Sequence, residues 1–247
     1  EMGNSNNGGS SFTLKFNGYF QEIELCPSAP DTIYAVRRVP YTNVAQTKTW
    51  YRMEFLYATA FGNGIWYGLP AGWPSAPTTD SLTTMLRAEI SVTPAAPRTV
   101  YALVTGTANG GSGLYGIYKS VDRGASWTFQ CCGAGPGGPA SLTNPNPMGY
   151  ATDGSGEGAQ QDYNVALSVD PTNVNKLQLG GIMRWVSTNG GASFTCPAGW
   201  TESGSPSYIH SDVQDIRQYG SDIWVACDGG IYYSNDGGTT FNKRVNG

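Results

Sequence analysis

The chain has 247 residues and a formal net charge of −4, and charged residues make up 13% of it, about half the share in an average soluble domain. No stripe of basic residues occurs, which argues against a nucleic-acid partner, and no run of about 18 apolar residues occurs, which argues against membrane insertion. The 34 glycines, the 15 tyrosines and the lack of a helical period indicate an all-β chain with many turns.

Two alternating strands joined by a proline or glycine turn recur four times along the chain. The first strands of these pairs begin near Glu22, Glu89, Ala166 and Asp215, and the second strands begin near residues 32, 99, 176 and 222. A third strand follows each pair and enters a turn, as Gly230–Tyr233 does, and a fourth strand leaves that turn. A repeat of this kind indicates one supersecondary unit used several times.

The turn between the third and fourth strands carries a pattern that we call the box: Ser-x-Asp/Asn-x-Gly-x-Ser/Thr-aromatic. Its Asp or Asn is expected to accept hydrogen bonds from backbone N–H groups of the turn, and its glycine to supply a positive φ. The aromatic residue is expected to begin the next strand and to pack into the core. Boxes span residues 5–12, 120–127, 187–194 and 234–241, and a degenerate copy spans 59–66.

Four strands in about 50 residues correspond to one blade of a β-propeller. The expected fold class is therefore all-β, a β-propeller of four-stranded antiparallel blades with a box in each outer hairpin. Blades are predicted at residues 15–78, 82–132, 160–198 and 208–247, and residues 1–14 are predicted to be the last hairpin of a preceding blade. We expect residues 1–247 to be a propeller segment of a larger protein, open or closed by residues outside this sequence.

The five cysteines include no CxxC pair, which argues against a zinc site. Cys131 and Cys132 are adjacent in a loop rich in glycine and proline. Unpaired structural thiols and a loop disulfide formed in an oxidising compartment both account for this pair.

The boxes resemble the Asp-box, or BNR, repeats of sialidases, sortilin-type receptors and family 74 xyloglucanases, and the resemblance covers essentially the whole chain. The segment 148–158, continuing to Pro171, resembles large secreted propeller proteins of gliding bacteria of the Bacteroidetes type. That resemblance implies export by a type IX system and display outside the cell. The stretch His210-Ser-Asp-Val-Gln-Asp215 is similar to a His-x-Asp stretch of those proteins but lacks its second histidine.

Two functions remain open at this point. The leading hypothesis is an extracellular, cell-surface structural or binding propeller, part of a larger adhesin or surface assembly, with other domains or proteins of that assembly or a polysaccharide as partners. It predicts no hydrolytic active site. The alternative is a glycoside hydrolase, family 74-like or sialidase-like, that acts on polysaccharide. Two acids converging at about 5–9.5 Å would favour the enzyme, and a flat face with no perturbed carboxylate would favour the scaffold.

The hydrolase alternative has three candidate catalytic residues, Glu22, Glu89 and Asp215, at matching places in three first strands. First strands lie nearest a propeller axis, where one carboxyl group could act as acid and another as base or nucleophile. Inheritance of the repeat explains the shared register equally well. A ring of first strands holds such positions apart, so the sequence does not ensure that they converge.

A loop rich in glycine places oxygen ligands at alternate positions, Asp153, Ser155 and Glu157, with Asp162 nearby. Oxygen clusters on flexible turns suit Ca²⁺, so we expect the oxygens of Asp153 and Glu157 to converge and to offer a calcium site. The twelve-residue EF-hand loop is absent, and an ordinary loop is the alternative. No other cofactor is expected.

Two tryptophans, Trp73 and Trp200, lie in matching Pro-Ala-Gly-Trp segments between blades. An exposed aromatic ring there could stack on a sugar, and a buried one would pack against the neighbouring blade. Both remain candidates for ligand binding. His210 is the only histidine, and we expect it to be a turn residue rather than a catalytic base.

Overall fold

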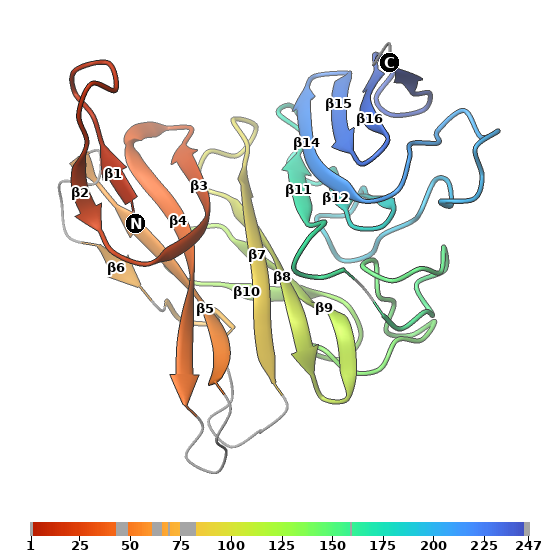
Figure 1. Ribbon diagram of the computed structural model, residues 1–247, viewed down its shortest axis with the longest axis horizontal. Coiled ribbons are helices and arrows are strands. Elements are labelled where there is room, and N and C mark those ends of the chain that lie inside the picture. The colour runs from red at the N-terminus through yellow and green to blue at the C-terminus, as the bar shows by residue number, and fades with distance from the viewer. Residues whose placement is uncertain are drawn as a thin grey trace.

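The strands of the chain form an arc of small antiparallel sheets (Figure 1). A computed structural model describes residues 2–42, 49–60, 66–68, 70–74, 83–158 and 160–244. Strands β1 (Met2–Asn4) and β2 (Thr13–Phe16) pair as a hairpin at one end of the arc, and the sheet nearest the C-terminus forms the other end. Among the described residues no helix is long and apolar enough to cross a membrane.

Each sheet is built from strands that follow one another in the chain. The first sheet contains β3 (Tyr19–Cys26), β4 (Ala29–Thr42), β5 (Thr49–Ala58) and β6 (Tyr67–Gly68). The second contains β7 (Thr84–Val92), β8 (Val100–Ala108), β9 (Gly111–Ser120) and β10 (Thr128–Cys131). The third contains β11 (Ala166–Val169), β12 (Leu177–Gly180) and β13 (Arg184–Ser187), and the fourth contains β14 (Val213–Tyr219), β15 (Asp222–Cys227), β16 (Gly230–Ser234) and β17 (Asn242–Lys243). This consecutive order confirms the predicted fold class, a β-propeller of antiparallel blades.

The third sheet departs from the predicted four strands. Its fourth position is held by a single antiparallel bridge, in which Val186 and Thr195 exchange two backbone hydrogen bonds of 2.9 Å. Two residues further along the ladder, Pro197 would face Arg184 and would have to donate a hydrogen bond. Proline has no N–H, so the strand cannot continue.

The boxes lie between the third and fourth strands, and their hydrogen bonds repeat from one to the next. In the box 120–127, the Ser120 Oγ accepts the N–H of Gly124 at 2.8 Å and donates to the Asp122 Oδ1 at 2.7 Å. Asp122 also accepts the N–H of Ser126 at 2.8 Å. The boxes at 5–12, 187–194 and 234–241 reproduce these three bonds. The degenerate copy at 59–66 lies mostly outside the described residues.

Three of the boxes also pack against the preceding sheet through the glycine at their fifth position. A side chain at Gly124 would collide with Phe55 of the first sheet, and one at Gly191 would crowd Ile117 of the second. A side chain at Gly238 would crowd Arg184 of the third sheet, whose Nη2 donates to the Gly238 carbonyl at 2.9 Å. The positive φ that the turn needs and the close approach to the neighbouring sheet both require glycine at these positions.

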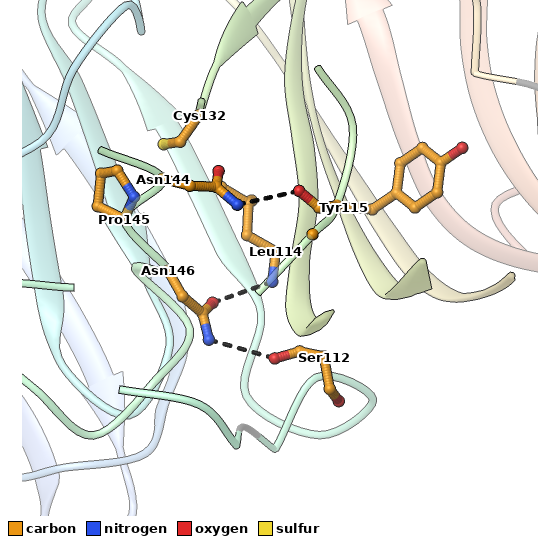
Figure 2. A pocket seen from close by; sticks show the side chains of 9 residues that line it. Ser112, Leu114, Tyr115, Cys132, Asn144, Pro145 and Asn146 are labelled. Carbon is orange, nitrogen blue, oxygen red and sulfur yellow. Dashed lines mark hydrogen bonds between the residues drawn. The ribbon is translucent and has the colours of Figure 1, made fainter. Parts of the chain in front are cut away.

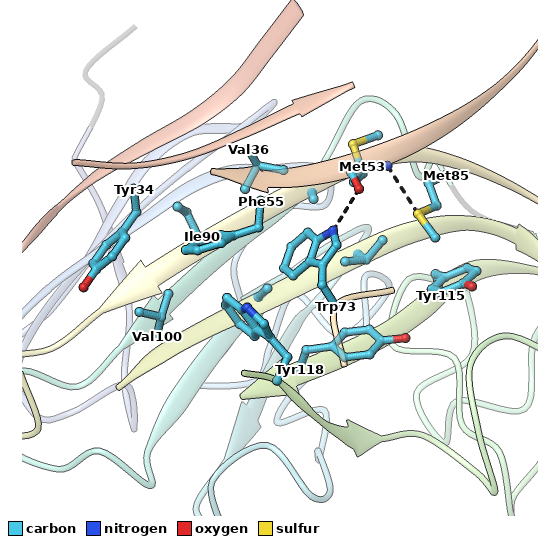
Figure 3. Packing of buried hydrophobic residues seen from close by; sticks show 14 of the residues in the cluster. Tyr34, Val36, Met53, Phe55, Trp73, Met85, Ile90, Val100, Tyr115 and Tyr118 are labelled. Atoms are coloured by element: carbon cyan, nitrogen blue, oxygen red, sulfur yellow. Dashed lines mark hydrogen bonds between the residues drawn. The ribbon is translucent and has the colours of Figure 1, made fainter. Parts of the chain in front are cut away.

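The core is divided into layers between successive sheets. One cluster joins the first and second sheets, a second joins the second and third, and a third joins the third and fourth. Figure 3 shows part of the first cluster, in which Phe55 and Val36 of the first sheet meet Ile90 and Val100 of the second. Each inner sheet therefore buries both of its faces, which explains why its strands carry few charges.

A long segment joins the second and third sheets, and one asparagine fixes it to the second sheet (Figure 2). The buried Asn146 side chain accepts the N–H groups of Leu114 at 3.0 Å and Met148 at 3.2 Å, and donates to the carbonyls of Ser112 and Gly156 at 3.2 Å each. The cavity drawn in Figure 2 is only about 10 Å³, too small for an organic ligand.

The same segment begins with a covalent link. Cys131 and Cys132 are joined by a disulfide, so the loop-disulfide alternative applies to this pair. Cys26, Cys196 and Cys227 are free thiols.

The box hydrogen bonds give a direct stability prediction. Ser120→Ala removes a buried acceptor from the Gly124 N–H and should lower the free energy of unfolding by about 1–3 kcal/mol. Ser5→Ala removes the equivalent 2.9 Å bond to Gly9 in an exposed box and should cost less than about 1 kcal/mol, because water replaces the lost partner. Urea unfolding of both variants measures the two costs. Equal losses of unfolding free energy in the two variants would contradict a role for burial in the strength of the box hydrogen bonds.

Candidate functional site

The first strands of the four sheets lie side by side around the axis of the arc. β3 lies against β7, β7 against β11, and β11 against β14. Gln21 on β3 accepts the Ala88 N–H at 2.9 Å and donates to the Leu86 carbonyl at 3.0 Å, and Ser91 on β7 accepts the Val169 N–H at 3.1 Å. Side-chain-to-backbone hydrogen bonds therefore fix the spacing of the inner strands.

A cavity of about 250 Å³ opens where β3, β7, β11 and β14 meet. Its charged lining, which we call the axial cluster, comprises Glu22, Glu24, Arg87, Glu89, Asp215 and Arg217. Four carboxyl groups thus face two guanidinium groups within one concave site, which is the kind of environment that perturbs proton affinities.

The three acids predicted from the sequence, Glu22, Glu89 and Asp215, all belong to this cluster, so the expectation that a ring of strands holds them apart is wrong. Sequence reasoning missed the other three members, Glu24, Arg87 and Arg217. Each of them is two residues from a predicted acid on the same strand, and the period of two places both on one face. That spacing was the signal available in the sequence.

Glu89 is buried, and its carboxyl group has two different partners. Arg87 donates to Glu89 Oε1 from Nε at 2.9 Å and from Nη2 at 2.7 Å. Burial raises the pKa of Glu89 well above its ordinary value, and the hydrogen bond to Glu22 and the charge of Glu22 raise it further, while Arg87 acts in the opposite direction. The buried carboxyl group of Glu89 therefore keeps its proton more readily than an exposed glutamate does.

The pKa of Glu24 lies close to neutral pH. Burial raises its pKa from 4.5 to about 7, and the charges of Glu22 and Asp215 add to that rise against the opposing effect of Arg217. Arg217 lies 4.0 Å from Glu24 Oε1 and donates to Asp215 Oδ2 at 3.0 Å. One guanidinium group therefore stands between an acid that keeps its proton and a carboxylate from another sheet.

A second cavity of about 400 Å³ shares Arg87 with the axial cluster. Arg38 lines this second cavity. Its guanidinium carbon lies 4.7 Å from the ring centre of Tyr19 and 4.5 Å from the ring centre of Tyr51. Tyr19 and Asp162 also line this cavity, and Tyr19 is largely exposed. Exposed aromatic and hydrogen-bonding side chains next to a cluster of acids suit the binding of a sugar chain.

The predicted calcium ligands do not come together. Asp153 Oδ1 accepts the N–H of Ser155 at 2.9 Å and its hydroxyl at 2.7 Å, within its own turn. Glu157 instead accepts the backbone N–H groups of Ser112 and Ala140, and Asp162 lines the second cavity. The described residues contain no group of three or more His, Cys, Asp or Glu side chains able to hold a metal ion. The expected convergence of Asp153 and Glu157 is therefore wrong, because each carboxylate caps a different stretch of backbone.

The two tryptophans have opposite environments. Trp73 is 5% exposed, donates from Nε1 to the Met53 carbonyl at 2.8 Å, and packs on Phe55 and Trp127 (Figure 3). A ligand-binding role for Trp73 is therefore wrong. Trp200 is 48% exposed and stays a candidate platform, although it lines neither cavity at the axis.

No family model matches the chain. Over 120 residues, 45% of this chain, it is 34% identical to a xyloglucanase of Hypocrea jecorina (strain QM6a), and the match spans 12% of that protein. One similar solved structure is an ancestral GH74 enzyme, with 13% identity and a TM-score of 0.49 over 93% of this chain and 24% of that enzyme. Another is YCF48 from Cyanidioschyzon merolae, with 12% identity and a TM-score of 0.49 over 95% of this chain and 58% of that protein. A Trypanosoma rangeli sialidase in complex with sialic acid is also similar, with 14% identity and a TM-score of 0.48 over 96% of this chain and 39% of that enzyme. The propeller architecture rests on the strand order of the chain itself.

The proton held by Glu24 should make stability depend on pH. Because the pKa of Glu24 is higher in the folded state than its ordinary value, its contribution is complete below about pH 4.5 and is lost as the pH rises toward about 7. We expect the free energy of unfolding to fall by up to about 3 kcal/mol over that window, and Glu24→Gln to remove most of this slope. Urea unfolding at a series of pH values measures it. A slope that Glu24→Gln leaves unchanged would assign the effect to other groups, such as the Glu22–Glu89 pair.

Because the two tryptophans differ in burial, replacing each of them by alanine should lower the free energy of unfolding by different amounts. Trp73→Ala should lower the free energy of unfolding by about 3–5 kcal/mol, because it empties a packed aromatic cluster. Trp200→Ala should change it by less than about 0.5 kcal/mol. Guanidinium unfolding of the two variants compares them, and a large loss for Trp200→Ala would show that its exposed ring is structurally required.

Proposed function

We propose that the chain is part of a secreted, carbohydrate-active propeller that hydrolyses glycosidic bonds in a polysaccharide, with the axial cluster as its active site. The observation that carries this proposal is that Glu24, whose pKa is raised to about 7, lines the same cavity as three other acids and can therefore donate a proton near neutral pH. Glycoside hydrolysis needs one protonated carboxyl group and one ionised carboxylate on either side of the scissile bond. The 34% identity with a xyloglucanase over 120 residues adds support for a polysaccharide substrate.

In this proposal Glu24 is the general acid and Asp215 is the general base. Glu24 gives its proton to the glycosidic oxygen as the bond to the sugar carbon breaks. Asp215, which accepts a hydrogen bond from Arg217, faces the reaction from β14 and takes a proton from a water molecule as the water oxygen forms its new bond to that carbon. The pKa of Glu89 is also raised by its burial, and the charges of Glu22 and Asp215 help to raise the pKa of Glu24.

The adjoining cavity would hold the polysaccharide on one side of the cleaved bond. Arg38 lies over one face of the Tyr19 ring, and the ring also lines the cavity. Asp162 and Gln21 supply hydrogen-bonding groups to the same cavity. Aromatic faces stack on sugar rings, and carboxylates and guanidinium groups bind their hydroxyls.

A second function is a cell-surface propeller that binds its partner without turnover. Two ion pairs within strands favour it: Arg87 holds Glu89 at 2.7 Å, and Arg217 holds Asp215 at 3.0 Å. Such pairs are also expected where acids serve only to fix the inner strands. Under this proposal the partners are other proteins of a surface assembly or a polysaccharide, and export through a type IX system remains part of it.

Turnover separates the two functions. We expect the intact protein to release reducing ends from xyloglucan, β-glucan or sialoside panels, and Glu24→Gln and Asp215→Asn to lower the rate by about 100-fold or more, since each removes an acid or base from the reaction. Glu202→Gln is the matched control, because Glu202 only accepts the Gly199 N–H at 3.0 Å outside the axial cluster. Polysaccharide binding with no released product would support the binding propeller instead.

A further inference from the structure

Arg38 on β4 has no acid partner among the described residues. Its neighbours Arg37 and Arg52 both pair with Glu54 at 2.7 Å. Arg38 forms no ion pair within the described part of the chain, and its Nη1 donates to the Leu86 carbonyl at the long distance of 3.5 Å. A guanidinium group carries five N–H donors, so the described residues leave most of those of Arg38 to a ligand.

Two tyrosine rings hold the Arg38 guanidinium group in place within the second cavity. Tyr19 is its cross-strand partner on β3, and Tyr51 approaches it from β5. The backbone N–H of Tyr51 donates to Thr84 Oγ1 of the second sheet at 3.2 Å, which anchors this wall. Stacking on aromatic faces fixes the plane of a guanidinium group and leaves the donors along its edge free. Arg38 is therefore preorganised to bind through that edge.

These three side chains point toward the second sheet. Arg38 is two residues from Val36 on β4, and alternate residues of a strand share a face. Val36 packs in the core between the first and second sheets, and so does Met53, which is two residues from Tyr51 (Figure 3). Tyr19 shares the face of its partner Arg38. The cavity thus lies between the first and second sheets, and the outer face of the first sheet takes no part in it.

The other charged groups of the cavity differ from Arg38. Arg87 is already neutralised by Glu89, whose Oε1 lies 2.7 Å from its Nη2. Asp162 is exposed in the segment before β11, and the described residues offer it no ion pair. One cation and one carboxylate, from different elements and not paired with each other, therefore line the same cavity of about 400 Å³.

This combination matches the two edges of a uronic acid. Such a sugar carries a carboxylate on one edge of its ring and hydroxyl groups on the opposite edge. A carboxylate accepts two parallel hydrogen bonds from the edge of a guanidinium group, and this geometry is more specific than a single charge. A carboxylate of the protein accepts hydrogen bonds from sugar hydroxyls. A neutral sugar would leave the guanidinium group without an anion.

We propose that the second cavity holds a uronic acid residue of an acidic polysaccharide, with the sugar carboxylate on Arg38 and sugar hydroxyls on Asp162. This inference rests on the proposed role of the cavity in holding a polysaccharide, and it names the class of that polysaccharide.

The test is the binding of defined oligosaccharides to the intact protein, measured by isothermal titration calorimetry. The probes are tetragalacturonate, its methyl ester, and a galactan oligomer sulfated to the same charge. We expect tetragalacturonate to bind at least about 10-fold more tightly than the other two, since only its planar carboxylates match the guanidinium edge. Equal affinity for the acid and its ester, tighter binding of the sulfated oligomer, or no binding of tetragalacturonate would each overturn the proposal.

Substitution of Arg38 assigns the preference to this side chain. Arg38→Gln should weaken binding of tetragalacturonate by about 10- to 100-fold and leave binding of the methyl ester unchanged. Arg38→Lys should have an intermediate affinity, because it keeps the charge and loses the two parallel donors. Arg98→Gln is the matched control, because Arg98 is exposed in the turn between β7 and β8 and lines neither cavity. An equal loss in Arg98→Gln would reduce the effect to general charge attraction and reject the site. Circular dichroism and thermal unfolding establish that each variant is folded.

Glu24→Gln separates this inference from the proposed hydrolysis. The variant retains Arg38 and Asp162, so we expect it to bind tetragalacturonate as tightly as the wild type does. Binding in both proteins with no release of reducing ends would uphold the uronic acid site and reject the hydrolase. Hydrolysis of neutral polysaccharides with no preference for tetragalacturonate in binding would uphold the hydrolase and reject the uronic acid site.

Discussion

The fold depends on sheets that bury both faces against their neighbours. A small antiparallel sheet exposes apolar groups on two sides, and their removal from water is the main favourable contribution to folding. Here the removal is completed at the outer rim by the box, whose glycine allows a hairpin to lie directly on Phe55, Ile117 or Arg184 of the sheet before it. Stability in such an arrangement is a sum over neighbouring units, because each unit contacts only the next.

That packing also determines the chemistry of the axis. The inner strands are held close by the hydrogen bonds of Gln21 and Ser91, while the boxes hold neighbouring sheets together at the outer rim. The closeness forces four acids and two arginines into one cavity, where the arginines neutralise only part of the charge. The excess negative charge is relieved because the pKa values of Glu24 and Glu89 are raised, so burial of the first strands and reactivity of the site have one cause.

The parts of this structure that follow from local chemistry were predictable from the sequence. Each box is closed by hydrogen bonds within eight residues, so its pattern gave the hairpin, the strand order and the class of fold. The missing fourth strand of the third sheet depends on Pro197, which reads equally well as an ordinary loop residue. The convergence of Glu22, Glu89 and Asp215 depends on how tightly four sheets meet, and no single segment carries that information. Trp73 and Trp200 show the limit most clearly, since both follow Pro-Ala-Gly but only Trp73 has Phe55 and Trp127 beside it.

The disulfide between Cys131 and Cys132 has a consequence for what holds the molecule together. A cross-link stabilises a protein largely by reducing the conformational entropy of the unfolded chain. This effect grows with the length of the loop that the cross-link closes. Adjacent residues close almost no loop, so this bond leaves the unfolded chain nearly as free as before. With the thiols of Cys26, Cys196 and Cys227 unpaired, no disulfide joins one sheet to another among the described residues. The arc is therefore a noncovalent assembly along one polypeptide, and its thermodynamic stability is almost independent of the redox potential of the surroundings.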